Sequence, residues 1–435
     1  MTSILIRGCT AVRSTGRVQT NVLIDAGRIV SMDAPADAPA DRIIEAEGLH
    51  LLPGLIDDHV HFRDPGLTHK EDLRTGSRAC ALGGVTSFLE MPNTIPNTTT
   101  QAILEEKLAL AAQKSLVNYG FYIAATPHNL EELKHAHRTP GIKIFVGSST
   151  GDLLVDDQED LEAIFRETTL GIAIHAEDET TVRENRDRIG HSTDVRDHSR
   201  VRDHAAAEIC TKRLTELANR YEHHLQVMHI STRQELPYMD SPHVTAEVCI
   251  HHLLLNIEDY DRLGTFGQMN PSLKTKADNE ALWEAVRDGT IDVIATDHAP
   301  HTIMEKAAPY PLSPSGMPGV QTLLPLLLQA VHEGRLTLEK MVELTSENPA
   351  RIWGMHQKGQ LEEGYDADLV LVDLEQTRTI TREEQASKCG WTPWEGVQVT
   401  GWPTHTIVMG QIVMEHGVVN ENAKGQEILY TRDLR

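Results

Sequence analysis

The stretch LLPGLIDDHVHF, Leu51–Phe62, is an apolar run that ends in polar side chains able to bind metal. Seven similar runs follow, and helix-like segments such as TQAILEEKLALAAQK separate several of them. These runs are VTSFLEMP (85–92), NYGFYIAAT (118–126), GIKIFVG (141–147), GIAIHAED (171–178), LQVMHIST (225–232), HVTAEVCI (243–250) and IDVIATDHAPH (291–301). Eight strands that alternate with helices predict an α/β fold of the (β/α)8 TIM-barrel type. A doubly wound sheet is the alternative, but it would be expected to carry a glycine-rich phosphate turn after an early strand, and the sequence has none.

The two ends of the chain have a different pattern. The first 50 residues alternate apolar and polar side chains between turn residues, and the same alternation returns in ADLVLVDL (367–374) and HTIVMGQIVMEHG (405–417). Alternation of this kind predicts short antiparallel strands. Because chain termini often lie close together, we expect residues 1–52 and 358–435 to form one small β domain beside a catalytic barrel of residues 53–357.

Composition limits the function and the compartment. The chain has 435 residues, with 40 Lys and Arg against 64 Asp and Glu, and this net charge of −24 argues against a nucleic-acid-binding surface. Arg7 interrupts the short apolar N-terminal stretch, and no apolar run is long enough to span a membrane, so neither a signal peptide nor a membrane segment is expected. The five cysteines are scattered without a CxxC pair, which indicates free thiols in a reducing cytoplasm.

Histidines are unusually frequent, with 23 in the chain, and four of them end apolar runs. His59 and His61 are two apart on a strand, so both rings face the same side. His175 and His229 end the fifth and sixth runs, and Asp297 ends the eighth. Any one of them alone could be a buried core residue. In a barrel, however, these positions converge on the face where active sites lie, so together they predict a metal site.

Lys143, in GIKIFVG, lies inside an apolar run. Burial disfavours the ammonium form of a lysine. A neutral amine can react with carbon dioxide to give a carbamate whose two oxygens could bridge two metal ions. Pairing with a buried acid is the other reading, and the residue pattern leaves both open.

Longer motifs resemble a known family. The sequence is similar to the amidohydrolase superfamily, and more narrowly to dihydroorotases, and the similarity extends through the barrel into KGQLEEGYDADLVLVD (358–373). The motifs that carry it are PGLIDDHVHFRDPG (53–66), GGVTSFLEMPNT (83–94), HAED (175–178), HIST (229–232) and ATDHAPH (295–301).

The resemblance implies two zinc ions per chain. One would be held by His59, His61, Asp297 and Lys143 as an N6-carboxylysine; the other would be held by Lys143, His175 and His229. An activated water would attack the ring amide of dihydroorotate, with Asp297 as general base and then general acid. The reverse direction cyclises N-carbamoyl-L-aspartate, a step of pyrimidine biosynthesis.

The resemblance also implies a substrate site. Arg63, Asn93 and His301 match residues that bind the substrate carboxylate, and Asn270, Ser315 and Gly316 match positions that border the substrate. Arg63 is two residues beyond His61, on the same face if the strand continues; the other reading is a surface arginine before the DPG turn.

Two other functions compete with a dihydroorotase. Hydantoinases, dihydropyrimidinases and allantoinases share the ligands but handle substrates without this carboxylate. A non-catalytic scaffold of the pathway would be expected to have lost ligands, which are all present. Relatives often form dimers, so a homodimer is an open possibility.

Nearby polar residues carry smaller predictions. Asp57 shares the face of His59 and is predicted to fix its tautomer, and Glu177 is predicted to do the same for His175. His251 and His252 are adjacent, so on a strand their side chains would diverge and a shared metal is not expected. His198 lies in a charged stretch and is predicted to be solvated.

Overall fold

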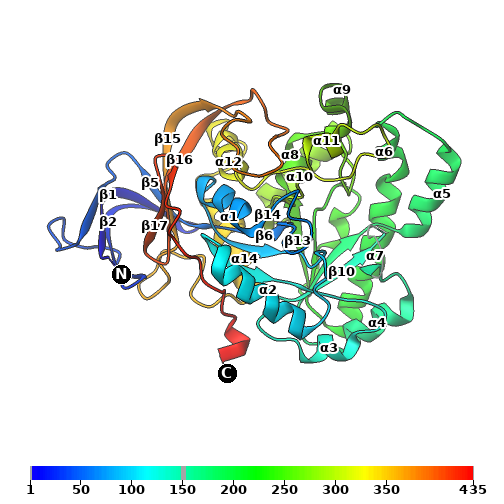
Figure 1. The fold of residues 1–435 in the computed structure, drawn as a ribbon, viewed down its shortest axis with the longest axis horizontal. Helices are drawn as coiled ribbons and strands as arrows, with labels where there is room; N and C mark the ends of the chain where they lie inside the picture. The colour runs from blue at the N-terminus through cyan, green and yellow to red at the C-terminus, as the bar shows by residue number, and fades with distance from the viewer. Residues whose placement is uncertain (1, 148–152, 435) are drawn as a thin grey trace.

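The protein was analysed as a computed structural model, which describes residues 2–147 and 153–434. Its centre is a ring of parallel strands surrounded by helices (Figure 1). One sheet has the order β6-β7-β8 and the other β9-β10-β11-β12-β13-β14, and a bridge from Val60 to His298 joins the end of β14 to β6. The strands are β6 (Leu55–Val60), β7 (Val85–Glu90), β8 (Asn118–Phe121), β9 (Ile123–Ala124), β10 (Ile142–Val146), β11 (Ile172–Ala176), β12 (Leu225–Val227), β13 (Val244–Cys249) and β14 (Val293–Ala295). The predicted barrel is confirmed, with β8 and β9 as two parts of one strand position.

Helices cover the outside of this ring. Several begin where a side chain caps free backbone N–H groups: Asp72 accepts from the Thr75 N–H before α1, and Thr275 accepts from the Asp278 N–H before α10. The helices are α1 (Leu73–Leu82), α2 (Gln101–Lys114), α3 (Leu130–His135), α4 (Gln158–Glu167), α5 (Glu179–Ile189), α6 (Asp197–Val201), α7 (His204–Tyr221), α8 (Ile250–Leu254), α9 (Tyr260–Leu263), α10 (Lys276–Asp288), α11 (Ile303–Lys306), α12 (Leu323–His332), α13 (Leu338–Val342) and α14 (Asn348–Ile352).

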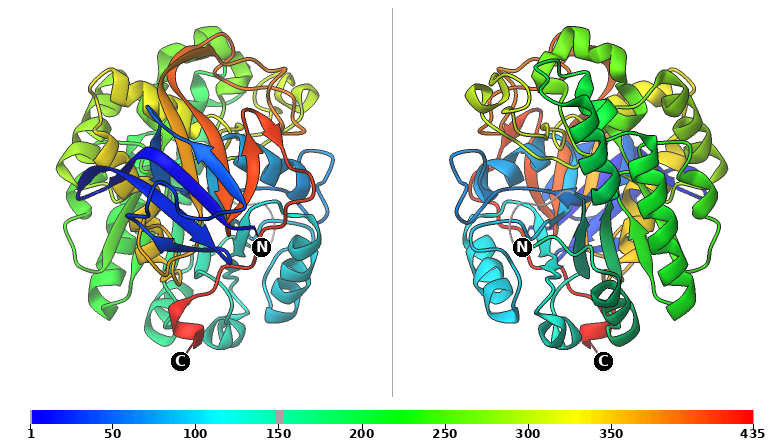
Figure 2. Two further views of the ribbon diagram at one scale, coloured as in Figure 1. Left: turned by 90° about the vertical axis from the view of Figure 1, so that its left-hand side faces the viewer. Right: turned by 90° about the vertical axis from the view of Figure 1, so that its right-hand side faces the viewer.

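The two ends of the chain form a second sheet, as predicted. Its order is β18-β17-β16-β15-β5-β1-β2-β3, with β4 paired to β1, and the N-terminal and C-terminal strands lie side by side in Figure 2. The halves meet where Val370 of β15 pairs with Leu52 of β5. The strands are β1 (Ile4–Arg13), β2 (Gly16–Asp25), β3 (Arg28–Ser31), β4 (Arg42–Glu45), β5 (His50–Pro53), β15 (Leu369–Thr379), β16 (Gln398–Val408), β17 (Gln411–Glu415) and β18 (Val418–Val419).

The β domain packs closely on the barrel. At Gly401 of β16 an added Cβ would lie 2.5 Å from the Leu328 Cβ of α12, so this approach needs a glycine. The segment after β18 continues onto the barrel, where the Tyr119 N–H donates to the Gln426 carbonyl at 3.0 Å and Tyr430 is fully buried. The domain limits 1–52, 53–357 and 358–435 stay a prediction.

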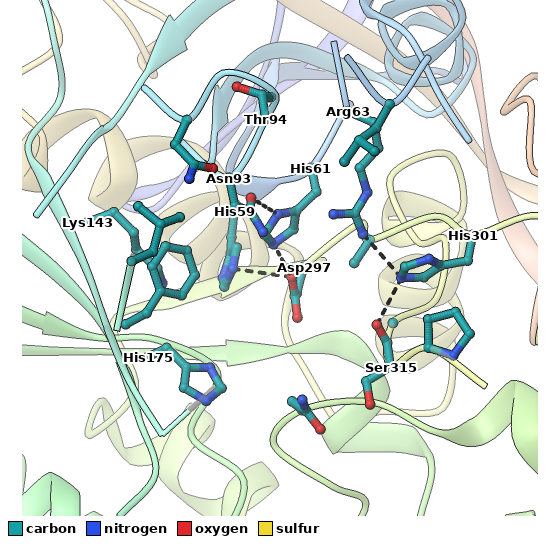
Figure 3. Close-up of a pocket in the computed structure, with 18 of the residues that line it drawn as sticks. His59, His61, Arg63, Asn93, Thr94, Lys143, His175, Asp297, His301 and Ser315 are labelled. Carbon is teal, nitrogen blue, oxygen red and sulfur yellow. Dashed lines mark hydrogen bonds and ion pairs between the residues drawn. The ribbon is translucent and has the colours of Figure 1, made fainter. Parts of the chain in front are cut away.

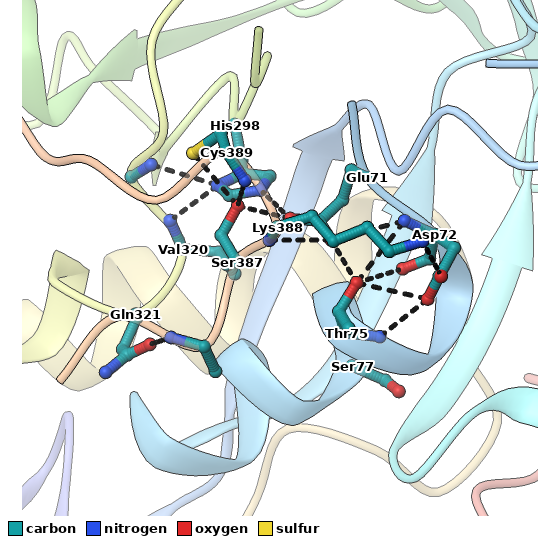
Figure 4. Close-up of polar contacts among 12 residues, drawn as sticks. Glu71, Asp72, Thr75, Ser77, His298, Val320, Gln321, Ser387, Lys388 and Cys389 are labelled. Carbon is teal, nitrogen blue, oxygen red and sulfur yellow. Dashed lines mark hydrogen bonds and ion pairs between the residues drawn. The ribbon is translucent and has the colours of Figure 1, made fainter. Parts of the chain in front are cut away.

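Residues 380–397, which connect β15 to β16 and are called the strap below, reach from the β domain to the loops at the open end of the barrel (Figure 1). The strap contacts the loop before α1: Ser387 donates to Glu71 and Lys388 donates to Asp72 (Figure 4), and Lys388 also donates to the Thr68 carbonyl. It also contacts the loop after β14, because the Trp391 Nε1–H donates to the His301 carbonyl at 2.8 Å. The strap therefore joins two loops of the barrel to the β domain.

Among the described residues, no helix is long and apolar enough to span a membrane. All five cysteines are buried free thiols.

Candidate active site

The predicted site residues line one cavity of about 900 Å³ at the ends of the barrel strands (Figure 3). They are His59, His61, Arg63, Asn93, Lys143, His175, His229, Asn270, Asp297, His301, Ser315 and Gly316. Residues from seven strand positions and their loops meet here because parallel strands end at the same side of a barrel.

One group consists of two histidines and a carboxylate. The Asp297 Oδ1 atom lies 3.2 Å from the His59 Nε2 and 2.9 Å from the His61 Nε2. The three side chains each offer one ligand atom, and these atoms all lie within 4.8 Å of one another. Burial lowers the pKa of His59 and of His61 to about 4, so both rings are neutral at pH 7 and keep a lone pair for a cation.

Asp297 keeps its charge in this setting. Burial alone would raise the pKa of its carboxyl group, but the nearby His59 and His61 outweigh burial and hold that pKa well below its usual range. A buried carboxylate beside two neutral imidazoles is a set of donors that suits a divalent cation such as zinc.

A second group lies across the cavity. His175 is on β11 and His229 follows β12, and the His175 Nδ1 lies 2.8 Å from the His229 Nε2. The two groups are close, since the ring centroids of His59 and His229 are 5.3 Å apart.

Lys143 lies on β10 and is fully buried. Its Nζ lies 2.8 Å from the Met228 Sδ, which is a weak acceptor, and within the described residues it has no ion pair with an acid. Burial lowers the pKa of Lys143 to about 8 and raises that of Glu247 to about 7, and the interaction between the two opposes both shifts. The carboxylated form of Lys143 stays a prediction.

Three site residues have strained backbones. Arg63, His229 and Asp297 have φ values of 62°, 44° and 45°, in the left-handed region that non-glycine residues rarely adopt. Such conformations persist where the surrounding structure imposes them, often at functional sites. Here each one turns a side chain into the cavity directly after or near the end of a strand.

Glu247, on β13, was not predicted from the sequence, yet it holds His59: its Oε1 lies 2.9 Å from the His59 Nδ1 and 3.2 Å from the His229 N–H. The prediction that Asp57 fixes the His59 tautomer is wrong. Asp57 instead accepts hydrogen bonds from the Thr296 hydroxyl and the His59 backbone N–H. The reason is a register shift in β6 between Asp57 and Val60, which breaks the alternation on which the prediction relied.

Glu177 has the predicted contact. Its Oε2 lies 2.9 Å from the His175 Nε2, and Arg202 donates to the same oxygen. This ion pair holds the pKa of Glu177 at about 2 despite burial, so the carboxylate is charged and orients the His175 ring. The sequence pattern did not predict Arg202 as a site residue, because its partner Glu177 is 25 residues away in the chain.

Arg63, His301 and Lys70 form one end of the cavity. The Arg63 side chain is buried at 7% exposure, its Nη2 lies 3.3 Å from the His301 Nε2, and its Nε has no hydrogen-bond partner. The surface-arginine reading is therefore wrong. The His301 Nε2 also lies 3.0 Å from the Ser315 carbonyl, and the Lys70 Nζ lies 3.0 Å from the His301 Nδ1.

The remaining substrate candidates surround these groups. The Asn93 Oδ1 lies 2.8 Å from the His61 Nδ1, so this side chain orients a histidine as well as lining the cavity. Gly316 has a φ of 131°, and a Cβ there would lie 2.6 Å from the Ala299 carbonyl oxygen, so only glycine fits.

Two predictions about the environment of histidines are wrong. His198 is buried, and its Nε2 lies 2.9 Å from the Asn270 Oδ1. His251 and His252 lie in the short helix α8 instead of on a strand, and their rings are 4.3 Å apart. With Cys249 they form a buried group whose ligand atoms lie within 4.8 Å.

Comparison with known proteins agrees with this arrangement. Dihydroorotases of Methanosarcina mazei and Halobacterium salinarum are each 38% identical to the chain, over 93% and 94% of its length and 93% and 96% of theirs. The L-hydantoinase of Arthrobacter aurescens superposes with a TM-score of 0.95 at 29% identity, covering 98% of this chain and all of that one. Residues 50–413 match the amidohydrolase family, and the chain belongs to that family.

Proposed function

We propose that the chain is a dihydroorotase, a hydrolase of a cyclic amide that reversibly cyclises N-carbamoyl-L-aspartate to dihydroorotate in pyrimidine biosynthesis. The relatives named dihydroorotase support this activity. The observation that carries it is the buried guanidinium of Arg63, which faces the cavity beside His301. A buried cation with free donors needs an anion, and the carboxylate of dihydroorotate is the group that distinguishes this substrate from neutral cyclic amides.

The donor pattern supports a carboxylate at that position. The Ser315 carbonyl can only accept, so the His301 Nε2 carries a proton. The Arg63 Nη2, 3.3 Å away, is also a donor. The His301 N–H cannot accept from Arg63, so this Arg63 N–H lacks an acceptor; a carboxylate oxygen placed there would accept from Arg63 and share the His301 N–H with the Ser315 carbonyl.

Two zinc ions fit the donor set. His59, His61 and Asp297 would hold one, His175 and His229 the other, and Lys143 would bridge them as an N6-carboxylysine. Burial lowers the pKa of Lys143 to about 8, which makes its neutral amine accessible near pH 7; this form would add carbon dioxide, with formation of an N–C bond and release of one proton. When bound, the two cations supply a polarised substrate carbonyl and an activated water.

The protein's own residues would handle the proton. The Asp297 Oδ1 faces His59 and His61, which leaves Oδ2 to take a proton from the attacking water. The same carboxylic acid would return that proton to the departing ring nitrogen as the amide bond breaks. Glu247 and Glu177 hold the His59 and His175 rings in place during this exchange.

A hydantoinase or dihydropyrimidinase is the second candidate, because solved structures with those names superpose with TM-scores of 0.95 and 0.90. Allantoinase belongs to the same group of readings. The test is turnover by the purified, zinc-loaded protein of dihydroorotate, hydantoin, dihydrouracil and allantoin. Dihydroorotate should be opened with the highest kcat/KM; a preference for any neutral ring would overturn the proposal.

A non-catalytic scaffold is disfavoured because every predicted ligand lines the cavity. Metal analysis separates the two: the enzyme should bind about two ions per chain and a scaffold about none. The cytoplasmic location and the homodimer stay predictions.

A further inference from the structure

We propose that Lys70 is a positioning residue for substrate recognition: it fixes His301 in the tautomer that carries its proton on Nε2. The inference rests on the proposed function for the identity of the substrate, but the tautomer itself does not. Lys70 lies in the loop between β6 and α1, with 15% of its side chain exposed, and it lines the same cavity as Arg63.

The contacts of His301 agree on this tautomer. An ammonium group has only donors, so the Nδ1 that faces the Lys70 Nζ at 3.0 Å must accept. The Ser315 carbonyl, 3.0 Å from Nε2, has only lone pairs, so Nε2 must donate. Glu305 holds Lys70 in place, with 3.2 Å between its Oε1 and the Lys70 Nζ.

The choice of tautomer decides what Arg63 can do. If Nε2 lacked a proton, it would accept from the Arg63 Nη2 at 3.3 Å, and that donor would be occupied. With the proton on Nε2, which is shared with the Ser315 carbonyl, that nitrogen cannot accept from Arg63. Lys70 therefore keeps the Arg63 N–H available for an acceptor of the substrate.

The charges around His301 keep its ring neutral. The substrate is therefore recognised through the position of the His301 proton and not through a positive charge on the ring. Burial, followed by the cations Arg63, Lys70 and Lys306, holds the pKa of His301 well below its usual range, and the Ser315 carbonyl opposes them weakly. Among the acids near these cations, Asp297, Glu90 and Glu71 act on Arg63, and Glu305 acts on Arg63 and is paired with Lys70. Loss of Lys70 would remove both a cation and the donor that selects the tautomer.

The strap supports both partners. Lys388 donates to Asp72 (Figure 4) and to the Thr68 carbonyl at 2.9 Å, and these two residues lie on either side of Lys70 in the chain. Trp391 donates to the His301 carbonyl at 2.8 Å. Both loops are thus attached to one segment of the β domain, which keeps the distance between Lys70 and His301 fixed.

Kinetics of Lys70→Met and Lys70→Arg in the zinc-loaded protein test the role in recognition. Lys134→Met is the matched control, since Lys134 is a surface lysine on α3 paired with Glu131. In Lys70→Met, we expect the KM for dihydroorotate to rise about tenfold with kcat within about twofold, as for loss of one charge-assisted contact. Lys70→Arg should restore most of the loss, and Lys134→Met should match the wild type. An equal rise of KM for dihydrouracil, or no rise at all, would overturn the proposal.

A measurement without turnover tests the tautomer directly. Long-range ¹⁵N–¹H spectra of histidine-labelled protein, with the His301 signal identified by His301→Gln, should show a proton on Nε2 from pH 6 to 8. In Lys70→Met the His301 signals should move toward a mixture of tautomers or titrate in that range. Unchanged signals would refute the role of Lys70. If the chain opened only neutral rings, the proposed function would fail, yet these spectra would still decide on Lys70.

Discussion

Replacement of Arg63 by methionine should separate dihydroorotate from neutral substrates. Methionine keeps most of the apolar stem of the buried side chain but removes every donor. A hydrogen bond from a charged group contributes about 1.5–3 kcal/mol, and a guanidinium can donate two to one carboxylate. His301, whose Nε2 lies 3.3 Å from the Arg63 Nη2, would retain part of the binding. We therefore expect a loss of about 2–4 kcal/mol, which lowers kcat/KM by about 30-fold to 900-fold.

The assay follows ring opening of dihydroorotate by the loss of the ring's ultraviolet absorbance. Dihydrouracil, which has the ring but no carboxylate, serves as the control substrate, and its slow turnover should change less than about threefold. Arg63→Lys should fall between wild type and Arg63→Met, because it keeps the charge but loses the paired geometry. An equal loss for both substrates would show that Arg63 supports the fold and does not bind the carboxylate. An unchanged kcat/KM for dihydroorotate would refute the role altogether.

Three further predictions concern the bridge, the strap and acid stability. Lys143→Ala should lose metal and activity, and small carboxylic acids such as acetate should restore part of both; absence of rescue would argue against a carbamate. Trp391→Phe removes the hydrogen bond to the His301 carbonyl, worth about 1 kcal/mol, and should raise the KM for dihydroorotate about fivefold at unchanged kcat. Burial lowers the pKa of His198 and of His224 to about 4, below the value of about 6.5 for an unfolded chain. The unfolded state therefore binds more protons, and the free energy of unfolding of the metal-free protein should decrease as pH falls from about 6.5 to 4; urea unfolding at pH 7 and pH 5 measures this, and equal values would contradict it.

The barrel could be predicted because its strands are buried on both sides. Such strands are continuous apolar runs, and the polar residues that end them, such as His59 and Asp297, mark the face where the strands end. The β domain could be predicted for the opposite reason, since strands with one exposed face alternate, as β2 does.

The partners of the site residues were harder to predict, because they depend on three-dimensional proximity. Glu247 reaches His59 from 188 residues away, and Lys70 reaches His301 from 231 residues away. No spacing rule joins such pairs. Strand alternation predicts Asp57 as the partner of His59, but the alternation does not hold through the register shift in β6. His198 was expected in solvent because its neighbours in the chain are charged, whereas its ring is buried against Asn270.

The most direct test of the central claim is a crystal structure of the zinc-loaded protein with bound dihydroorotate, with anomalous scattering recorded at the zinc edge. We expect two anomalous peaks, one beside His59, His61 and Asp297 and one beside His175 and His229. Density for a carbamate on Lys143 should lie between them, and the substrate carboxylate should contact Arg63 and His301. A cavity with no anomalous peak, or a substrate bound with its carboxylate away from Arg63, would contradict the account.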